Sequence, residues 1–213
     1  FIYAASSSCY GKINGKTKET ERINIEHPYA LSKYLGEQVV FNWQKVYKLP
    51  INSIRIFNAY GPRVRTTGAY GAVMGVFLRQ KIADKPLTIV GDGRQSRDFI
   101  HVKDVVKAFL AAAKSKISGE IFNLGAGKPQ SVNKLAKIIG GYKINIPDRP
   151  GEPKHSKADI TKIKRLLKWS PKISFKNGLK GMINEINDWK NAPLWTPKKI
   201  KKATQVWFKY LSK

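Results

Sequence analysis

The sequence predicts an α/β protein with a parallel sheet. Short apolar segments rich in Ile, Val and Phe alternate with longer segments whose apolar residues recur every three or four positions, beginning with 2–6 and 29–47. The first pattern is typical of buried strands and the second of helices that cover them. Alternation of the two favours a parallel sheet, because each helix returns the chain for the next strand. With 213 residues the chain can bury a core and form one domain or slightly more.

The first part of the chain predicts a strand, a long helix and a second strand. Residues 2–6 are apolar and short, as in a buried strand, whereas 12–26 are polar and predict a loop. The apolar positions of 29–47 have helical spacing, and the proline before them suits a first helical turn. A second buried strand is expected within 50–56, and the Gly-Pro pair at 61–62 ends this part.

The rest of the chain continues the alternation. Short strands are expected at 87–90, 120–124 and 143–147, and helices at 72–83, 102–114, 132–139, 160–168, 175–190 and 198–211. Ser131 and Asp159 can cap the helices that follow them, because their side-chain oxygens can accept a backbone N–H. Thr196 followed by Pro197 predicts the start of the last helix.

The net charge of +26 comes from 40 Lys and Arg against 14 Asp and Glu. Such a charge attracts phosphates of any kind. The excess is mostly lysine spread through nearly every segment, with no arginine-rich arm, zinc knuckle or basic ribbon with interleaved aromatic residues. We therefore attribute the charge to compositional bias and expect no specific nucleic-acid partner.

Several other classes of protein are disfavoured by composition. The single cysteine, Cys9, excludes an internal disulfide and fits a reducing cytoplasm. The three histidines and this cysteine are widely spread and give no metal-ligand spacing. No apolar run approaches the ~20 residues of a membrane helix. We expect a cytoplasmic protein without a metal site or a membrane partner.

The segment HPYALSK, 27–33, places a tyrosine and a lysine four residues apart on a predicted helix. At this spacing Tyr29 and Lys33 share one helix face. A free tyrosine titrates near pH ~10, but a nearby cation favours the phenolate and lowers that value. A tyrosine tuned in this way can move a proton to or from a sugar hydroxyl. The spacing alone is common, so other motifs must support this interpretation.

Six further motifs occur in one order around this pair. Together with HPYALSK they resemble the extended short-chain dehydrogenase/reductase family, in particular its NAD-dependent nucleotide-sugar epimerases and dehydratases. The resemblance extends from Ile2 to about Gly181. The motifs are YAASSSCYG, RIFNAYGPR, GDGRQSRDFIHVKDVV, FNLGAG, RPGEP and KADITK.

The resemblance implies a Rossmann-like sheet that binds NAD, with a smaller C-terminal α/β region that binds substrate. Similar enzymes begin with a glycine-rich turn that holds the pyrophosphate, and this chain has no such fingerprint. The chain is therefore expected to be the C-terminal part of such an enzyme, with on the order of a hundred residues preceding it. Residues 1–62 and segments near 99–125 would belong to the NAD-binding domain, 63–190 mainly to the substrate region, and 191–213 to a C-terminal helix.

The resemblance also assigns catalytic and cofactor-binding roles. The catalytic serine or threonine of similar enzymes lies four residues before a Tyr-Gly pair, which here is Ser6, and the two serines after it are alternatives. Tyr29 would be the acid/base. Lys33 would bind the nicotinamide ribose and lower the pKa of Tyr29. Phe57 would lie near the nicotinamide.

A second set of residues is implied for the substrate, a nucleotide-diphosphate sugar. Asn58 would contact its phosphate or sugar, just past a strand end where ligands bind in open α/β sheets. Arg97 and Arg149 would hold the diphosphate, because the planar guanidinium suits bidentate phosphate contacts. The remaining residues that the resemblance places around the nucleotide are Val73, Thr88, Val90 and Glu152.

The residues after Ser6 help to choose the reaction. Similar sugar 4,6-dehydratases carry an Asp-Glu pair there, and UDP-glucuronate decarboxylases carry a glutamate at the second position, whereas this chain has Ser7 and Ser8. Epimerization at C4 is therefore favoured. By the resemblance, Tyr29 would take the 4-hydroxyl proton, and NAD would accept the hydride and return it to the other face of the keto sugar. Dehydratase and decarboxylase remain alternatives. An inactive fragment that binds sugar nucleotides or other anions is a third.

Two further expectations concern the substrate and the oligomer. Ser156 aligns with the residue that limits the hexose pocket, and a small side chain there leaves room for an N-acetyl group at C2. This favours UDP-N-acetylhexosamines or their uronic acids over plain UDP-hexoses. The helix that carries Tyr29 also forms a dimer in similar enzymes, so we expect a homodimer of the complete enzyme.

Overall fold

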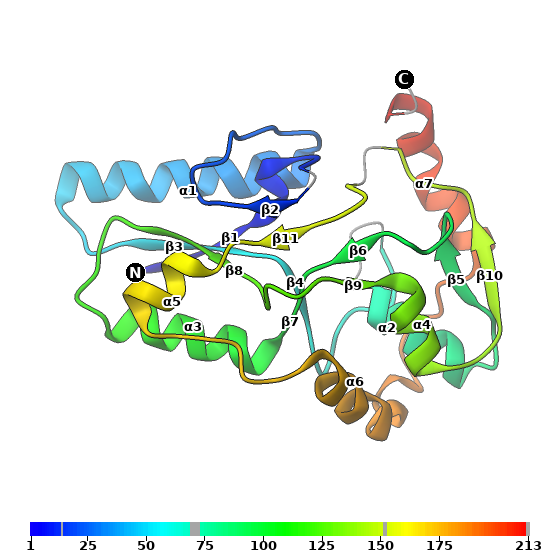
Figure 1. Cartoon of the computed structure of the whole chain (residues 1–213). Helices are drawn as coiled ribbons and strands as arrows, with labels where there is room; N and C mark the ends of the chain where they lie inside the picture. Colours follow the sequence, from blue (N-terminus) through cyan, green and yellow to red (C-terminus); the bar gives the residue numbers. More distant parts are fainter. Residues whose placement is uncertain (14, 69–72, 151–152, 212–213) are drawn as a thin grey trace. The chain divides into compact units, whose positions relative to one another are not determined.

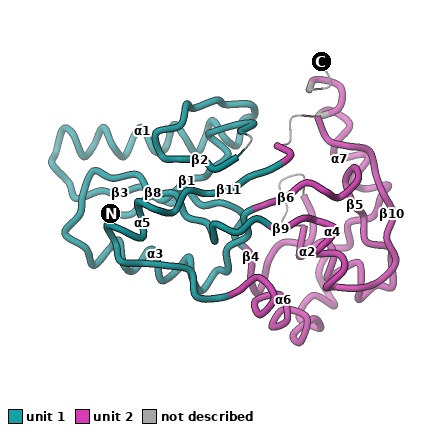
Figure 2. The backbone as a smooth tube through the Cα atoms, in the orientation of Figure 1, with its two compact units in different colours: residues 1–59, 98–129, 155–173 teal, residues 60–97, 130–154, 174–213 magenta. Residues whose placement is uncertain are grey.

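The computed structural model describes residues 1–13, 15–68, 73–150 and 153–211. The chain divides into two compact units, drawn in different colours in Figure 2. Unit 1 comprises residues 1–59, 98–129 and 155–173, and unit 2 comprises residues 60–97, 130–154 and 174–213.

Unit 1 is built on a parallel three-stranded sheet, which confirms the predicted α/β class (Figure 1). Its strands lie in the order β1 (Ile2–Ser6), β3 (Asn52–Ile56) and β8 (Ile121–Leu124). The middle strand is buried from Asn52 to Arg55 without alternation, as expected for a parallel strand that is covered on both faces. This continuous burial brings polar as well as apolar side chains of β3 into the interior.

Helices cover both faces of the sheet of unit 1 (Figure 1). Helix α1 (Pro28–Tyr47) packs on β1, while α3 (Val102–Lys114) and α5 (Thr161–Leu167) lie against the opposite face. Ile54 and Phe122 are fully buried at the centre of the resulting core. The smaller elements of unit 1 are η1 (Ser7–Tyr10), β2 (Lys16–Thr17), β7 (Phe99–His101) and β11 (Lys157–Ala158).

Unit 2 contains two small sheets and the remaining helices. Strand β5 (Leu87–Val90) pairs in parallel with β10 (Lys143–Ile146), and β6 (Ser96–Arg97) pairs antiparallel with β9 (Gln130–Ser131). Helix α2 packs against α4 and β5. The helices of this unit are α2 (Val73–Ile82), α4 (Val132–Ile139), α6 (Phe175–Asn184), η2 (Ile186–Trp189) and α7 (Pro197–Leu211). Strand β4 (Asn58–Tyr60), which begins in unit 1, pairs with β7.

Two helices lie where the sequence predicts them, and three predictions need correction. The expected loop 12–26 contains the short strand β2, which pairs with β11. Helices α3 and α4 have the predicted bounds, and Ser131 accepts the N–H of Lys134 at 3.1 Å as the expected cap. The expected helix 175–190 is divided, because α6 ends at Asn184 and a separate 3₁₀ turn follows. Asp159 accepts the N–H of Thr161 at 2.9 Å, but α5 begins only at that threonine.

Membrane and metal partners find no support in the described ranges. No described helix is long and apolar enough to cross a membrane. Among the same residues, His, Cys, Asp and Glu nowhere form a group of three that could hold a metal ion.

Two histidines cap helices of unit 1. Nδ1 of His27 accepts the N–H of Ala30 at the start of α1, and Nδ1 of His101 accepts the N–H of Lys103 at the start of α3, both at 3.2 Å. Burial lowers the pKa of both imidazoles, against smaller opposing effects of nearby carboxylates. Both caps therefore require the neutral imidazole, since a protonated Nδ1 cannot accept a hydrogen bond.

We expect the free energy of unfolding to fall as the pH drops from about 7 to 5. The unfolded histidines, with pKa near ~6.5, bind protons before the folded ones do, so protonation favours the unfolded chain. Each cap contributes on the order of 1 kcal/mol. Thermal melts at both pH values should show a smaller loss in a His27→Asn/His101→Asn variant, whose amide oxygens cap without titrating. An equal loss in both proteins would contradict this assignment.

Candidate active site

Three of the predicted site residues, Ser6, Phe57 and Asn58, lie at the edge of unit 1 where its parallel strands end. Ser6 is opposite Ile56, which is in turn opposite Leu124, so the three strands finish together. The N–H of Phe57 donates to the carbonyl of Leu124 at 2.9 Å and continues this edge. Ligands of open α/β sheets bind at the carboxyl ends of the strands. Ser6, Phe57 and Asn58 therefore occupy the position in unit 1 where a ligand is expected.

Ser6 is held in a defined orientation by its own turn. Its extended backbone begins η1, and its Oγ accepts the N–H of Ser8 at 3.2 Å. The hydroxyl of Ser8 also donates to Ser6 Oγ, at 2.9 Å. Because Ser6 Oγ is the acceptor in both bonds, its own proton remains available to a further acceptor. Ser8, one of the two alternatives to Ser6, orients that hydroxyl.

Helix α1 presents Tyr29 and Lys33 beside β1. The Lys33 ammonium donates to the carbonyl of Ala4 at 3.1 Å, and the Tyr3 hydroxyl donates to the carbonyl of Lys33 at 3.1 Å. The Tyr29 ring is 41% exposed and stacks on His27 with a centroid separation of 6.2 Å. Burial raises the pKa of Tyr3, with further contributions from Glu37 and Tyr29. The first turns of α1 are therefore fixed to the strand that ends at Ser6.

Asp98 holds the residues that follow strand β3. Phe57 is buried and Asn58 is exposed, and the N–H of Asn58 donates to the carbonyl of Asp98 at 3.2 Å. The buried Asp98 carboxylate accepts the N–H groups of Ala126, Gly127 and Ala158 at 2.8–3.0 Å. Burial raises the pKa of Asp98, and these N–H donors act in the opposite direction. This carboxylate joins three separate segments of unit 1 behind the strand edge.

The predicted nucleotide-binding residues lie mostly in unit 2. Val73 begins α2. Thr88 is buried in β5 and exchanges two hydrogen bonds with Gln80, at 2.9 and 3.1 Å, and the carbonyl of Val90 accepts from Gln95 at 2.8 Å. The side chain of Thr88 and the carbonyl of Val90 are therefore engaged within the protein. A nucleotide would therefore have to contact other atoms of Thr88 and Val90.

The predicted diphosphate and sugar contacts are divided between the units. Arg97, in β6, donates through Nη1 to the carbonyls of Ser96 and Lys154 at 3.1 and 3.4 Å. Arg149 is half-buried in the segment after β10. Ser156 belongs to unit 1, and its buried Oγ has no hydrogen-bond partner among the described residues. Glu152 lies outside the described residues.

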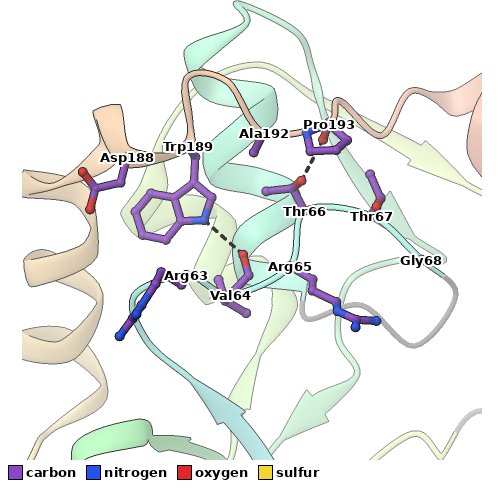
Figure 3. A pocket seen from close by; sticks show the side chains of 10 residues that line it. All are labelled: Arg63, Val64, Arg65, Thr66, Thr67, Gly68, Asp188, Trp189, Ala192 and Pro193. Atoms are coloured by element: carbon purple, nitrogen blue, oxygen red, sulfur yellow. Dashed lines mark hydrogen bonds between the residues drawn. The ribbon is translucent and has the colours of Figure 1, made fainter.

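A pocket of about 470 Å³ lies within unit 2 and contains none of the predicted site residues (Figure 3). Trp189 forms part of its wall and donates its indole N–H to the carbonyl of Val64 at 3.1 Å. The Thr66 hydroxyl donates to the carbonyl of Pro193 at 2.7 Å. Figure 3 shows the guanidinium groups of Arg63 and Arg65 pointing in different directions, so they do not converge on one anion.

Three features that hold the predicted site residues in place were not predicted from the sequence. His27 was not recognised as the cap of α1, although its place directly before Pro28 at the helix start is a signal. The role of Asp98, next to Arg97, was not predicted, although a carboxylate before a buried strand needs hydrogen-bond donors. The ion pair of Glu37 with Arg55 joins residues 18 positions apart. A charged Arg55 inside an apolar strand signals a buried partner, but no local pattern identifies Glu37 as that partner.

Comparison with known proteins identifies the family. Residues 1–125 match the model of the NAD dependent epimerase/dehydratase family. The chain belongs to this family. An uncharacterized UDP-glucose epimerase of Bacillus subtilis is 37% identical over 186 residues, which are 84% of this chain and 58% of that protein. A UDP-N-acetyl-alpha-D-glucosaminuronate decarboxylase of Bacillus cytotoxicus is 30% identical over 208 residues, 89% of this chain and 64% of that protein.

Solved structures agree with this assignment. The UDP-glucuronic acid 4-epimerase of Bacillus cereus, in complex with UDP-glucuronic acid and NAD, matches with a TM-score of 0.80 and 35% identity. The match covers 88% of this chain and 61% of that one. The family member described here therefore spans about three fifths of the length of the relatives it matches, and its fold is that of Rossmann-type epimerases.

Proposed function

We propose that this chain supplies the acid–base and substrate-binding residues of an NAD-dependent 4-epimerase of UDP-sugars. The observation that carries the proposal is the fixed arrangement of Tyr29 and Lys33 beside the strand that ends at Ser6. Lys33 is bound to β1 through Ala4, and the Ser6 hydroxyl is oriented by Ser8. A phenol and a hydroxyl at one strand edge can exchange a proton with a sugar hydroxyl placed between them.

The donors at this edge fit the nicotinamide ribose of NAD. The Lys33 ammonium has three N–H groups, and the described residues engage it through one hydrogen bond, to Ala4. Its other N–H groups would donate to ribose hydroxyls, and Phe57 lies at the strand edge that the backbone continues from Ile56. Bound NAD would supply a reversible hydride acceptor. Under this proposal Tyr29 moves the proton of the 4-hydroxyl and Ser6 donates a hydrogen bond to the reacting oxygen.

The substrate class follows from the relatives and from the basic residues of unit 2. Relatives named for UDP-glucose and UDP-glucuronate act on UDP-sugars, so we propose a UDP-sugar here. Arg97 and Arg149 would bind its diphosphate through their planar guanidinium groups. The small side chain of Ser156 would leave room at C2 of the sugar and so favours an N-acetylhexosamine or its uronic acid.

Decarboxylation is the second candidate reaction, because decarboxylases are among the relatives. Similar decarboxylases carry a glutamate at the position of Ser8, and similar dehydratases carry an Asp-Glu pair at the positions of Ser7 and Ser8. This chain has serine at both, and η1 contains no acidic residue in its first turn. This absence favours epimerization.

Product analysis tests the proposed reaction. The 213-residue chain is incubated with NAD and either UDP-glucuronic acid or UDP-N-acetylglucosamine, and the products are examined by NMR and mass spectrometry. Epimerization gives a C4 epimer of unchanged mass. A product that has lost carbon dioxide or water would show that the reaction is decarboxylation or dehydration instead of epimerization. Saturable binding of the sugar nucleotide without turnover would reduce the chain to a binding module.

We further propose that a second copy of the chain covers the outer face of α1. Leu31, Leu35, Val39 and Trp43 recur every four residues on this face and are 43–56% exposed. This stripe contains no charged residue, so two copies that each carry +26 can approach one another here with less repulsion than elsewhere.

Leu35→Glu is expected to convert the dimer to a monomer, because it places two carboxylates in the apolar contact. Sedimentation of the wild type and the variant measures this shift. Lys45→Glu, an exposed position of α1 outside the stripe, is the matched control and should leave the dimer intact. A monomeric wild type, or a dimer that survives Leu35→Glu, would contradict this interface.

A further inference from the structure

We propose that the buried ion pair between Glu37 and Arg55 is a positioning device that holds Tyr29 and Lys33 in place against Ser6. The pair lies inside unit 1, behind the strand edge, and touches none of the reacting groups assigned above. Its function would be to fix how α1 sits on the sheet. The kinetic part of this inference rests on the proposed function, whereas its structural part does not.

Glu37 lies on the same face of α1 as the proposed catalytic residues. Tyr29, Lys33 and Glu37 follow one another at intervals of four, so they form one row along the helix. Glu37 is only 1% exposed, while Tyr29 is 41% exposed. The row therefore begins at the proposed site and ends in the interior, where its last member is held.

Arg55 and Ser53 hold both oxygens of the Glu37 carboxylate. Arg55 Nη2 donates to Oε1 at 2.6 Å, and Arg55 Nε lies 3.1 and 3.2 Å from the two oxygens. The Ser53 hydroxyl donates to Oε2 at 2.7 Å. These donors come from the central strand β3, and the planar fork of the guanidinium permits little rotation of the carboxylate. A rotation or slide of α1 would break several of these bonds at once.

The same guanidinium also holds the turn that begins at Ser6. Arg55 Nη1 donates to the hydroxyl of Tyr10 at 2.8 Å, and Tyr10 is the last residue of η1. Burial raises the pKa of Tyr10 to about 12, so its phenol keeps its proton and donates to Asn123 Oδ1 at 2.8 Å. Arg55 thus connects the helix that carries Tyr29 with the turn that orients Ser6.

Gly36, between Lys33 and Glu37, sets the distance of α1 from β1. A Cβ at this position would lie 2.1 Å from the hydroxyl oxygen of Tyr3, so any other residue would force the Tyr3 side chain or α1 to move. The Tyr3 hydroxyl occupies that space and donates to the carbonyl of Lys33. The glycine contact and the ion pair together define both the distance and the rotation of α1.

Stability alone is a weak explanation for the pair. A buried ion pair loses much hydration free energy, and well-packed apolar residues often replace it without loss of stability. Apolar side chains of similar volume can fill the space, but they lack the directional bonds that fix α1 and η1 relative to each other. A stabilising role and a positioning role therefore make different predictions for a variant in which both charges are replaced.

The test compares four variants of the full 213-residue chain: Glu37→Gln, Arg55→Lys, the double variant Glu37→Met/Arg55→Met, and the control Asp104→Asn. Asp104 is another fully buried carboxylate of unit 1, bound by the N–H groups of Lys172 and Ile173 and away from α1 in the sequence. Hydrogen exchange of peptides is measured under conditions where circular dichroism shows a folded chain, together with kcat and KM for epimerization.

We expect about tenfold faster exchange in 28–37 for Glu37→Gln and Arg55→Lys, with 102–114 unchanged. The double Met variant should have the unfolding midpoint of the wild type. Its exchange in 28–37 should stay fast, and its kcat should stay low at an unchanged KM. Asp104→Asn should leave 28–37 unchanged. Uniform acceleration across unit 1, or full recovery of exchange by the double variant, would overturn the positioning role. A wild type without epimerase activity would refute the proposed function, and the exchange pattern would still decide the positioning role.

Discussion

Replacement of Tyr29 by Phe is expected to lower kcat for UDP-sugar epimerization by about 10²–10⁴-fold. The phenylalanine ring keeps the shape of the residue and its stacking on His27, which has a centroid separation of 6.2 Å, but it cannot accept or return a proton. Binding of the sugar nucleotide should change little, because the proposed diphosphate contacts are Arg97 and Arg149. The initial rate of epimer formation by NMR and the Kd by calorimetry measure the two effects separately.

Tyr47→Phe is the matched control for this prediction. Tyr47 lies at the other end of α1 and is 60% exposed, so the same loss of a hydroxyl there should leave kcat unchanged. If Tyr29→Phe retains full activity, Tyr29 does not move the proton. If both variants lose activity equally, the effect comes from the helix as a whole.

Replacement of Asp98 by Ala is expected to destabilise unit 1 by about 3 kcal/mol or more. The carboxylate is fully buried and accepts the N–H groups of Ala126, Gly127 and Ala158. Alanine leaves these buried donors without their acceptor. Denaturant unfolding followed by circular dichroism measures the change in the free energy of unfolding.

Asp92→Ala controls for the general effect of removing an aspartate. The Asp92 side chain is 67% exposed and lies 3.6 Å from the 86% exposed side chain of Arg94, so its loss should change stability by less than ~0.5 kcal/mol. A small effect of Asp98→Ala, similar to that of Asp92→Ala, would show that the three backbone N–H groups find other acceptors.

Local signals in the sequence were sufficient for most elements of the fold. Helices α3 and α4 have the predicted bounds, because their apolar spacing is regular and, for α4, because Ser131 was expected to cap the helix. The division of the segment 175–190 was not predicted. Two glycines in α6, Gly178 and Gly181, lower its helix propensity, and the apolar pattern that continues beyond them concealed the break.

The candidate site was predictable only where its residues carry a motif. Tyr29, Lys33 and Ser6 were predicted from their spacing and from the family resemblance, and Lys33 contacts β1, the strand that ends at Ser6. The ion pair that holds α1 on the sheet was not predicted. Glu37 and Arg55 are 18 residues apart, and their contact depends on how α1 crosses the sheet, which no local pattern specifies. A charged residue in the middle of an apolar strand, as at Arg55, is the signal that calls for a buried partner.

Calorimetric titration of the chain with NAD and with UDP-glucuronic acid tests the central claim most directly. The proposed site predicts saturable binding of both ligands. Lys33→Met should weaken NAD at least about tenfold without affecting the sugar nucleotide, and Arg97→Ala should do the reverse, because a lost charge-assisted contact costs about 1.5–3 kcal/mol. Absence of binding for both ligands, or wild-type affinities in both variants, would contradict the claim that these residues form a nucleotide-sugar epimerase site.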